Sequence, residues 1–157
     1  MEEKMTDFEK QCYEKYPVYL QGLNPENKQH DTLTGFECGE GWHKNLDNFF
    51  KAMENLNKLL MLTGNPDYYF TAWQVKEKYG MITVYDGLIA PAHDDDKLMD
   101  CLFDLQEALH SELDLACRRT CEHCGKDTVP LCKTRGYVQY LCEPCAEKTG
   151  RAYVRLT

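Results

Sequence analysis

The feature that most constrains the fold of this 157-residue chain is a pair of Cys-x2-Cys motifs. Cys121 and Cys124 form the first pair, Cys142 and Cys145 form the second, and seventeen residues separate the pairs. Two residues between paired cysteines let the chain turn tightly enough for both sulfurs to reach one ion at about 2.3 Å. Gly125 follows the first pair and relieves that turn, and a separation of about 15–20 residues is typical of zinc sites. The sequence therefore predicts one structural zinc ion, bound by these four cysteines.

The residues around these motifs predict a small zinc-binding module over residues 118–157. The segment "TVPLCKTRGYVQYL" has two short apolar runs around a polar turn, which predicts a β-hairpin that returns the second pair to the first. The segment "CEPCAEKTG" suits a short helix. This order is typical of a treble-clef or ribbon-like module. A closed set of four cysteines leaves no position for water or substrate, which argues against zinc catalysis.

Three further residues of this region need a role. His123 lies between two of the predicted ligands and is the alternative donor in place of one cysteine. Cys117 and Cys132 are not needed as ligands. We expect Cys132 to be packed as a small apolar side chain, because free cysteine is among the most buried residue types.

The cellular compartment affects whether the cysteines bind metal or form disulfides. No apolar run approaches the ~20 residues that a membrane span needs, and the acidic start of the chain lacks the features of a signal peptide. We expect a cytoplasmic location without membrane contact. In such a reducing compartment, clustered cysteines bind metal more often than they form disulfides.

Two amphipathic helices dominate the predicted body, residues 1–117. Apolar side chains recur every three or four residues over 43–62 and again over 94–118. The first stripe contains Leu46, Phe49, Phe50, Met53, Leu56, Leu59 and Leu60, and the second contains Leu98, Cys101, Leu102, Leu105, Leu109, Leu113 and Ala116. We interpret the three aspartates at 94–96 as helix N-caps. A divalent-ion site is the alternative interpretation of these aspartates.

The remaining body segments are less regular. Residues 2–21 predict a further helix with a break at Pro17. Residues 22–41 are rich in Gly, Asn and Pro, which predicts a long loop with a short strand at "FEC".

A β-hairpin completes the body. Residues 68–75 and 81–85 are β-branched and aromatic, and they flank a polar turn that contains Gly80. The expected fold class is α+β: two amphipathic helices on a small antiparallel sheet, followed by the zinc module.

Charge is divided unevenly between body and module. The chain carries a formal net charge of −8. Residues 1–117 contain 10 basic and 22 acidic side chains, a net −12, whereas residues 118–157 contain 8 basic and 4 acidic side chains, a net +4. Four thiolates and one zinc ion reduce the module to about +2. An acidic body repels nucleic acid at long range and steers the protein toward basic surfaces.

Catalytic motifs are missing from the sequence. It contains no Gly-rich phosphate loop, no Gly-x-Ser-x-Gly elbow and no paired histidines at metal spacing. We therefore expect no enzymatic activity. The alternative is a small polar site formed by Glu37, Cys38, Glu40 and His43, which we interpret as a surface loop that enters a helix.

Two binding functions remain. Basic residues with interleaved aromatics in the module can contact phosphates and stack on bases; they are Lys133, Arg135, Arg151, Arg155, Tyr137, Tyr140 and Tyr153. Exposed aromatic and acidic residues can instead engage a basic groove of a protein and compete there with nucleic acid. The candidate partner-binding residues are Trp42, Trp73, Lys76, Lys78, Tyr79, Lys133, Arg135 and Tyr137. A core position is the alternative for Trp42, Trp73 and Tyr79.

Three segments together carry a family resemblance: "FECGEGWHKNLDNF", "WQVKEKYGMITVY" and the two cysteine pairs. The matching residues are Cys38, Gly39, Gly41, Trp42, Gln74, Val75, Lys76, Glu77, Lys78, Tyr79, Gly80 and the four paired cysteines. In this order they resemble a family of small uncharacterised proteins encoded by bacteriophages and prophages. The hairpin departs from the family pattern, because "MITVY" stands where the family has a more basic segment. The resemblance implies phage origin and the host cytoplasm. Small accessory phage proteins often counter host defence, including CRISPR systems.

The leading hypothesis is a non-enzymatic zinc-containing phage protein that binds and inhibits a host protein. By analogy that partner is a nucleic-acid-handling defence complex, and the protein is anti-CRISPR-like. The alternative is a zinc-dependent nucleic-acid-binding protein. The sequence leaves the oligomeric state open.

Overall fold

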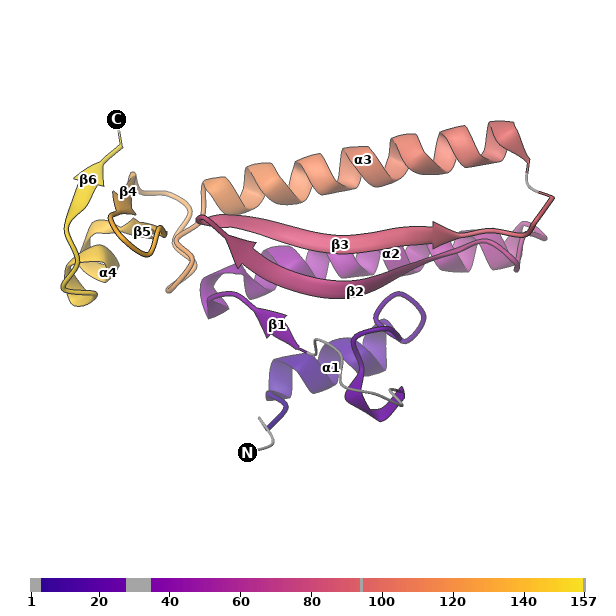
Figure 1. The fold of residues 1–157 in the computed structure, drawn as a ribbon, viewed down its shortest axis with the longest axis horizontal. Helices are drawn as coiled ribbons and strands as arrows, with labels where there is room; N and C mark the ends of the chain where they lie inside the picture. Colours follow the sequence, from indigo (N-terminus) through magenta and orange to yellow (C-terminus); the bar gives the residue numbers. More distant parts are fainter. Residues whose placement is uncertain (1–3, 28–34, 94, 157) are drawn as a thin grey trace.

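The computed structural model describes residues 4–27, 35–93 and 95–156. In chain order the elements are α1 (Asp7–Lys15), η1 (Pro25–Asn27), β1 (Phe36–Glu37), η2 (Glu40–Trp42), α2 (His43–Leu62), β2 (Tyr69–Lys78), β3 (Met81–Ile89), α3 (Asp96–Arg118), β4 (Leu131–Thr134), β5 (Tyr140–Cys142), α4 (Glu143–Lys148) and β6 (Tyr153–Arg155). Over the described residues the protein is a mixed α/β fold with four α-helices and two three-stranded sheets. Figure 1 shows an elongated molecule with the second sheet and α4 at one end.

The long β2–β3 hairpin and two helices form the body. α2 packs on β2, α3 packs on β3, and the two helices contact each other. The predicted helices on a small sheet are therefore present. The sheet is not purely antiparallel, however, because β1 pairs in parallel with β2, with Phe36 opposite Val75. Parallel strands need a crossover connection, and α2 provides it between β1 and β2.

The α2 helix has the predicted bounds, 43–62. Its predicted stripe is buried at Leu46, Phe50 and Met53, but Leu59 is 55% exposed. At roughly 100° per residue, Leu59 lies on the opposite side of the helix from these residues. Asn57 occupies the stripe instead, although it is polar. Its side chain is buried because its amide oxygen accepts from the Phe70 amide (2.7 Å) and its amide nitrogen donates to the Phe70 carbonyl (2.9 Å).

The first helix is shorter than predicted. α1 begins after a capping box in which the Thr6 side chain accepts from the Glu9 amide and the Glu9 carboxylate accepts from the Thr6 amide. It ends at Lys15, before Pro17, and the chain continues in turns. These turns cover the edge of β2 beyond β1, because the Tyr19 carbonyl accepts from the Ala72 amide at 2.8 Å.

The α3 helix starts one residue after its N-cap. The Asp95 side chain accepts from the Lys97 and Leu98 amides at 3.0 and 3.1 Å, which confirms N-capping at this position; Asp94 lies outside the described residues. Toward its middle, α3 turns polar side chains onto the sheet, so that Cys101 and Leu105 of the predicted stripe are exposed.

Asp86 on β3 explains why α3 directs polar side chains toward the sheet. Its carboxylate, 4% exposed, accepts from the Tyr19 hydroxyl (2.6 Å) and the Gln106 amide (3.0 Å), and it contacts His110 Nε2 at 2.9 Å. A buried carboxylate is tolerated only where such partners are present. This cluster therefore joins α3, β3 and the turns after α1.

Candidate metal centre

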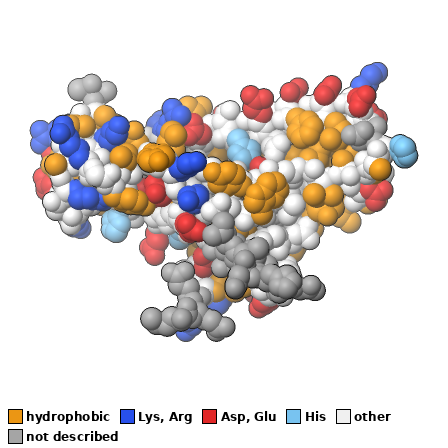
Figure 2. Space-filling view, viewed as in Figure 1, with side chains coloured by type: hydrophobic (Ala, Val, Ile, Leu, Met, Phe, Trp, Pro, Cys, Tyr) orange, Lys and Arg blue, Asp and Glu red, His pale blue; other side chains and the backbone are white. Residues whose placement is uncertain are grey.

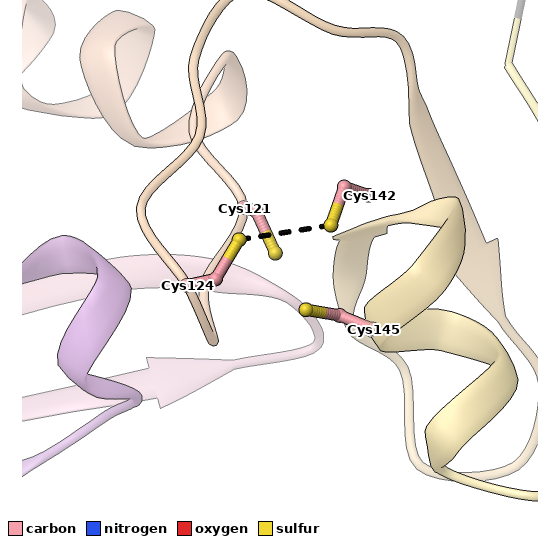
Figure 3. A group of neighbouring side chains, drawn as sticks. All are labelled: Cys121, Cys124, Cys142 and Cys145. Atoms are coloured by element: carbon pink, nitrogen blue, oxygen red, sulfur yellow. Dashed lines mark hydrogen bonds between the residues drawn. The ribbon is translucent and has the colours of Figure 1, made fainter.

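Four cysteine sulfurs come together at the end of the molecule beyond the β2–β3 turn. The Sγ atoms of Cys121, Cys124, Cys142 and Cys145 all lie within 4.8 Å of one another, and those of Cys124 and Cys142 are 3.6 Å apart. Figure 3 shows the four side chains converging from the loop after α3 and from the start of α4. Sulfurs at about 2.3 Å from a tetrahedral ion lie about 3.8 Å from each other. The four cysteines can therefore hold one metal ion.

Backbone hydrogen bonds shape the first cysteine pair into a tight turn. The Gly125 amide donates to the Cys121 carbonyl at 2.9 Å, and the Cys121 amide donates to the Lys126 carbonyl at 2.8 Å. Gly125 has a φ of 79°, a left-handed conformation that glycine adopts without a Cβ penalty. The turn relief that the sequence predicts at Gly125 is confirmed.

The hairpin positions the second pair. β4 pairs antiparallel with β5, which places Leu131 opposite Cys142, and Cys145 lies in the first turn of α4. The Glu122 amide donates to the Tyr140 carbonyl at 3.3 Å, which fixes the first turn beside β5. β6, which the sequence does not predict, pairs with the other edge of β4.

The cysteine thiols of this cluster differ in acidity. A hydrogen bond from the Lys126 amide lowers the pKa of Cys124 to about 7. Burial raises the pKa of Cys142 and of Cys145. Buried thiols keep their protons until a cation replaces them, so that metal binding at this site releases protons.

The donor set is closed within the part of the chain that the structure describes. His123 is exposed and does not belong to the cluster. Cys132 is packed among apolar residues of the module, and Cys117 is packed in the core of the body. Cys132 is therefore the small buried side chain that the sequence predicts, and Cys117 is buried as well. Four sulfur donors with no position left open are typical of structural zinc, and the residues present fit that ion.

The segment "CGEGW" packs the body closely against the first cysteine turn. A Cβ added at Gly41 would lie 2.1 Å from the Cys121 carbonyl oxygen, and one at Gly39 would lie 2.3 Å from the Glu122 carbonyl oxygen. The Gly41 amide also donates to the Glu122 carbonyl at 2.7 Å. Only glycine permits so close a backbone approach. These two glycines therefore serve the contact between body and metal site.

Trp42 completes this contact from the inside. Its side chain is 1% exposed, and its indole Nε1 donates to the Thr120 carbonyl at 3.1 Å. The prediction that Trp42 binds a partner is wrong, and the alternative core position is correct. The helix periodicity could not reveal this, because the residue that accepts its hydrogen bond lies 78 positions later in the chain.

Glu122 is a site residue that sequence reasoning missed. Although charged, it is almost fully buried. Its carboxylate accepts from the Gly39 amide (3.2 Å) and from the Gln139 side chain (3.3 Å). Burial raises its pKa. Nothing in the sequence around Glu122 indicates that its side chain is buried, because a glutamate between two paired cysteines is ordinarily exposed.

The other predicted partner-binding residues lie in two places. Lys76, Lys78, Tyr79 and Tyr137 line two adjoining depressions between the β2–β3 turn and the module. Lys133 and Arg135, on β4 and the turn after it, are exposed on the module. Trp73 is 50% exposed, lines neither of these two depressions, and packs its ring against Gly87 of β3. The structure thus brings part of the predicted set together and separates Trp73 from it.

The alternative polar site at residues 37–43 does not supply a reactive thiol. Burial raises the pKa of Cys38 well above its ordinary value, so the thiol remains protonated. Burial also lowers the pKa of His43, whose ring stacks on Phe8 with centroids 4.0 Å apart.

Charged side chains segregate on the surface. Figure 2 shows Lys and Arg gathered over the module and Asp and Glu in a row along α3. Within the described ranges, no helix is both long enough and apolar enough to cross a membrane.

Searches with this chain gave no matching family model, no matching curated protein and no matching solved structure.

Proposed function

We propose that this chain is a zinc-stabilised, non-enzymatic accessory protein of a bacteriophage. It acts in the host cytoplasm by binding and inhibiting a host protein that handles nucleic acid. The resemblance of the "CGEGW" and "QVKEKYG" segments to phage proteins supports the origin. The row of carboxylates along α3 is the observation that carries the inhibitory role.

Zinc is the ion proposed for the four cysteines, within a module of the treble-clef type. The order of first turn, β4–β5 hairpin and helix-borne second pair supports this type. A filled tetrahedral site leaves the ion no position for substrate. The metal therefore stabilises the module and does not take part in a reaction.

The carboxylates of α3 form a regular exposed line. Asp96, Asp100, Asp104 and Glu107 follow one another at steps of four, four and three residues, and all four are exposed. At a rise of 1.5 Å per residue, they give one negative charge per about 5.5 Å. One strand of duplex DNA carries one charge per about 3.4 Å. The α3 line therefore has a charge spacing of the same order as a nucleic-acid strand.

These carboxylates are also available for a partner. In the described ranges none of the four lies within 4.0 Å of a Lys, Arg or His nitrogen, whereas Asp114 at the other end of α3 pairs with Arg118. A partner with a basic groove gains from such free charges and excludes nucleic acid from the same groove. The net charge of −8 strengthens long-range attraction to a basic partner.

Capture from host cells with graded variants tests this function. The tagged wild-type protein is expected to retain a basic host protein, which added duplex DNA then displaces. Neutralising the line by Asp96→Asn, Asp100→Asn, Asp104→Asn and Glu107→Gln is expected to abolish this retention.

A matched control variant has the same net charge as the α3 variant. Glu14, Glu26, Asp67 and Asp127 are exposed carboxylates away from α3, and neutralising them should leave retention unchanged. Equal losses in both variants would show that total charge and not the α3 line governs binding. Retention that persists in the α3 variant, or that DNA does not compete, would refute the proposal.

A second candidate function is nucleic-acid binding by the zinc module. It is favoured by the net charge of +4 on residues 118–157 and by exposed Lys133 and Arg135. Titration with duplex and single-stranded oligonucleotides at several salt concentrations separates the two functions. Strong binding with a steep salt dependence would favour nucleic acid, and its absence would leave the protein-binding function.

A further inference from the structure

The contact between body and module leaves two adjoining depressions on the surface. One has a volume of 310 Å³ and lies between residues 76–79 and residues 136–138. The second has a volume of 350 Å³ and reaches from the end of β1 to Gln139. Both are lined by Lys76, Glu77 and Tyr137. We call the two depressions together the junction groove. Each is within the size range of small-ligand sites, about 300–1,000 Å³.

Tyr137 presents an aromatic face to this groove. Its hydroxyl donates to Glu77 Oε1 at 2.8 Å, which holds the ring across the junction. The Arg151 guanidinium lies 5.3 Å from the ring centroid. A guanidinium covers only one face of a ring, and Tyr137 is 56% exposed. The ring therefore keeps a face that a planar ligand can stack on.

Tyr79 supplies a second ring at the rim, in a strained conformation. Tyr79 and Gly80 join β2 to β3, and both have positive φ, 53° and 78°. This is the pattern of a type I′ turn, for which Asn-Gly is preferred. The Tyr79 side chain is 76% exposed, so burial does not account for an aromatic residue at this strained position. Strained residues of this kind cluster at ligand sites.

Polar groups of both signs complete the groove. Lys76 and Lys78 line it, and neither lies within 4.0 Å of a carboxylate of the described residues. Glu37, Glu77, Glu122 and Gln139 also line it. The two Glu77 oxygens accept from the Tyr137 hydroxyl and the Gly80 amide, and a carboxylate has lone pairs for further donors. An acidic peptide would gain from the lysines, but its side-chain carboxylates cannot donate hydrogen bonds to the glutamates. A ligand that fits both is an anion that also carries a planar, donor-rich ring.

We propose that the junction groove binds a nucleoside monophosphate. The base stacks on Tyr137 and Tyr79, its N–H groups donate to the acceptors around Glu37 and Glu77, and its phosphate pairs with the Lys76 and Lys78 ammonium groups. The α3 carboxylates take no part in this site, so the site is independent of the protein-binding function proposed above.

Titration of the zinc-loaded full chain with AMP, GMP, CMP and UMP tests the proposal, with inorganic phosphate and an eight-nucleotide single strand as further probes. At least one monophosphate is expected to bind in a one-to-one ratio and more tightly than inorganic phosphate. Tyr137→Ala is expected to weaken binding by roughly 5- to 150-fold, the effect of removing one base–aromatic stack. Tyr137→Phe keeps the ring but loses the hydrogen bond to Glu77 that holds it, and it should weaken binding less than Tyr137→Ala does.

Control variants keep the test specific. Tyr85→Ala removes an exposed ring of β3 outside the groove, and Lys58→Gln removes an exposed α2 lysine; both should bind as the wild type does. Lys76→Gln should weaken the monophosphate but not the corresponding nucleoside. Zinc content and thermal unfolding verify that each variant is folded.

Four results would overturn the proposal. They are absence of binding to all four monophosphates, equal binding of inorganic phosphate, unchanged binding in Tyr137→Ala, and a large gain in affinity for the eight-nucleotide strand. The last result would assign the groove to single-stranded nucleic acid.

Discussion

Replacing Gly41 by alanine should separate the body from the metal site. The new Cβ would lie 2.1 Å from the Cys121 carbonyl oxygen and 2.5 Å from that of Glu122, and backbone atoms cannot rotate away as a side chain can. Relieving this clash costs the hydrogen bond from Gly41 to Glu122 and the two that Gly39 and Trp42 donate across the same contact. At about 1 kcal/mol per hydrogen bond, the loss in unfolding free energy is about 3 kcal/mol.

Thermal unfolding of the zinc-loaded protein measures this loss. For a chain of this size, about 3 kcal/mol corresponds to a decrease in Tm of roughly 6–12 °C. Gly87→Ala is the matched control, since the nearest atom to its new Cβ is in the exposed Trp73 ring, at 2.9 Å, and that ring can move. We expect this control to change Tm by a few degrees at most. A Gly41→Ala protein that melts with the wild type would refute the reasoning that the glycines permit the contact.

Three further outcomes are expected. Tyr79→Asn should raise the unfolding free energy in urea by about 1 kcal/mol, because it relieves a left-handed conformation that disfavours tyrosine; a decrease would mean that the ring makes stabilising contacts. The double variant Cys121→Ser and Cys124→Ser should reduce zinc from one ion per chain to none by elemental analysis, and undiminished zinc would exclude these ligands. Burial raises the pKa of Asp47, but hydrogen bonds from its lysine and tyrosine neighbours outweigh burial and hold that pKa below its ordinary value. Its stabilisation is then present above the unfolded-state pKa of about 3.9 and is lost as the pH falls through the lower folded-state pKa. Asp47→Asn should therefore lose stability at neutral pH and approach the wild type on acidification, and a stability difference that does not change with pH would contradict this explanation.

Local patterns in the sequence predicted the parts of the fold that depend on neighbours in the chain. The bounds of α2 follow from the spacing of its apolar residues. The four cysteines follow from their spacing, because two-residue turns and a hairpin bring them together by local geometry. The N-cap at Asp95 is equally local.

Long-range contacts account for what the sequence did not reveal. Glu54 and Asn57 are polar but lie in the buried stripe of α2, because backbone groups from other segments need their hydrogen bonds. The rotation of α3 depends on Asp86, which reads as an ordinary strand residue until its partners are known. The segment "CGEGW" packs against a cysteine turn about 80 residues later in the chain, so its role could not be inferred from neighbouring residues.

The hydrogen bond from the Trp42 indole to the Thr120 carbonyl has a consequence during translation. A ribosome that has just made Trp42 must add 78 more residues before Thr120 is in place, which takes roughly 4–16 s at about 5–20 residues per second. Throughout that interval the indole N–H lacks its native acceptor, and the nascent chain presents an unshielded tryptophan to chaperones. Synthesis and docking of the segment that carries Thr120 therefore end this exposure.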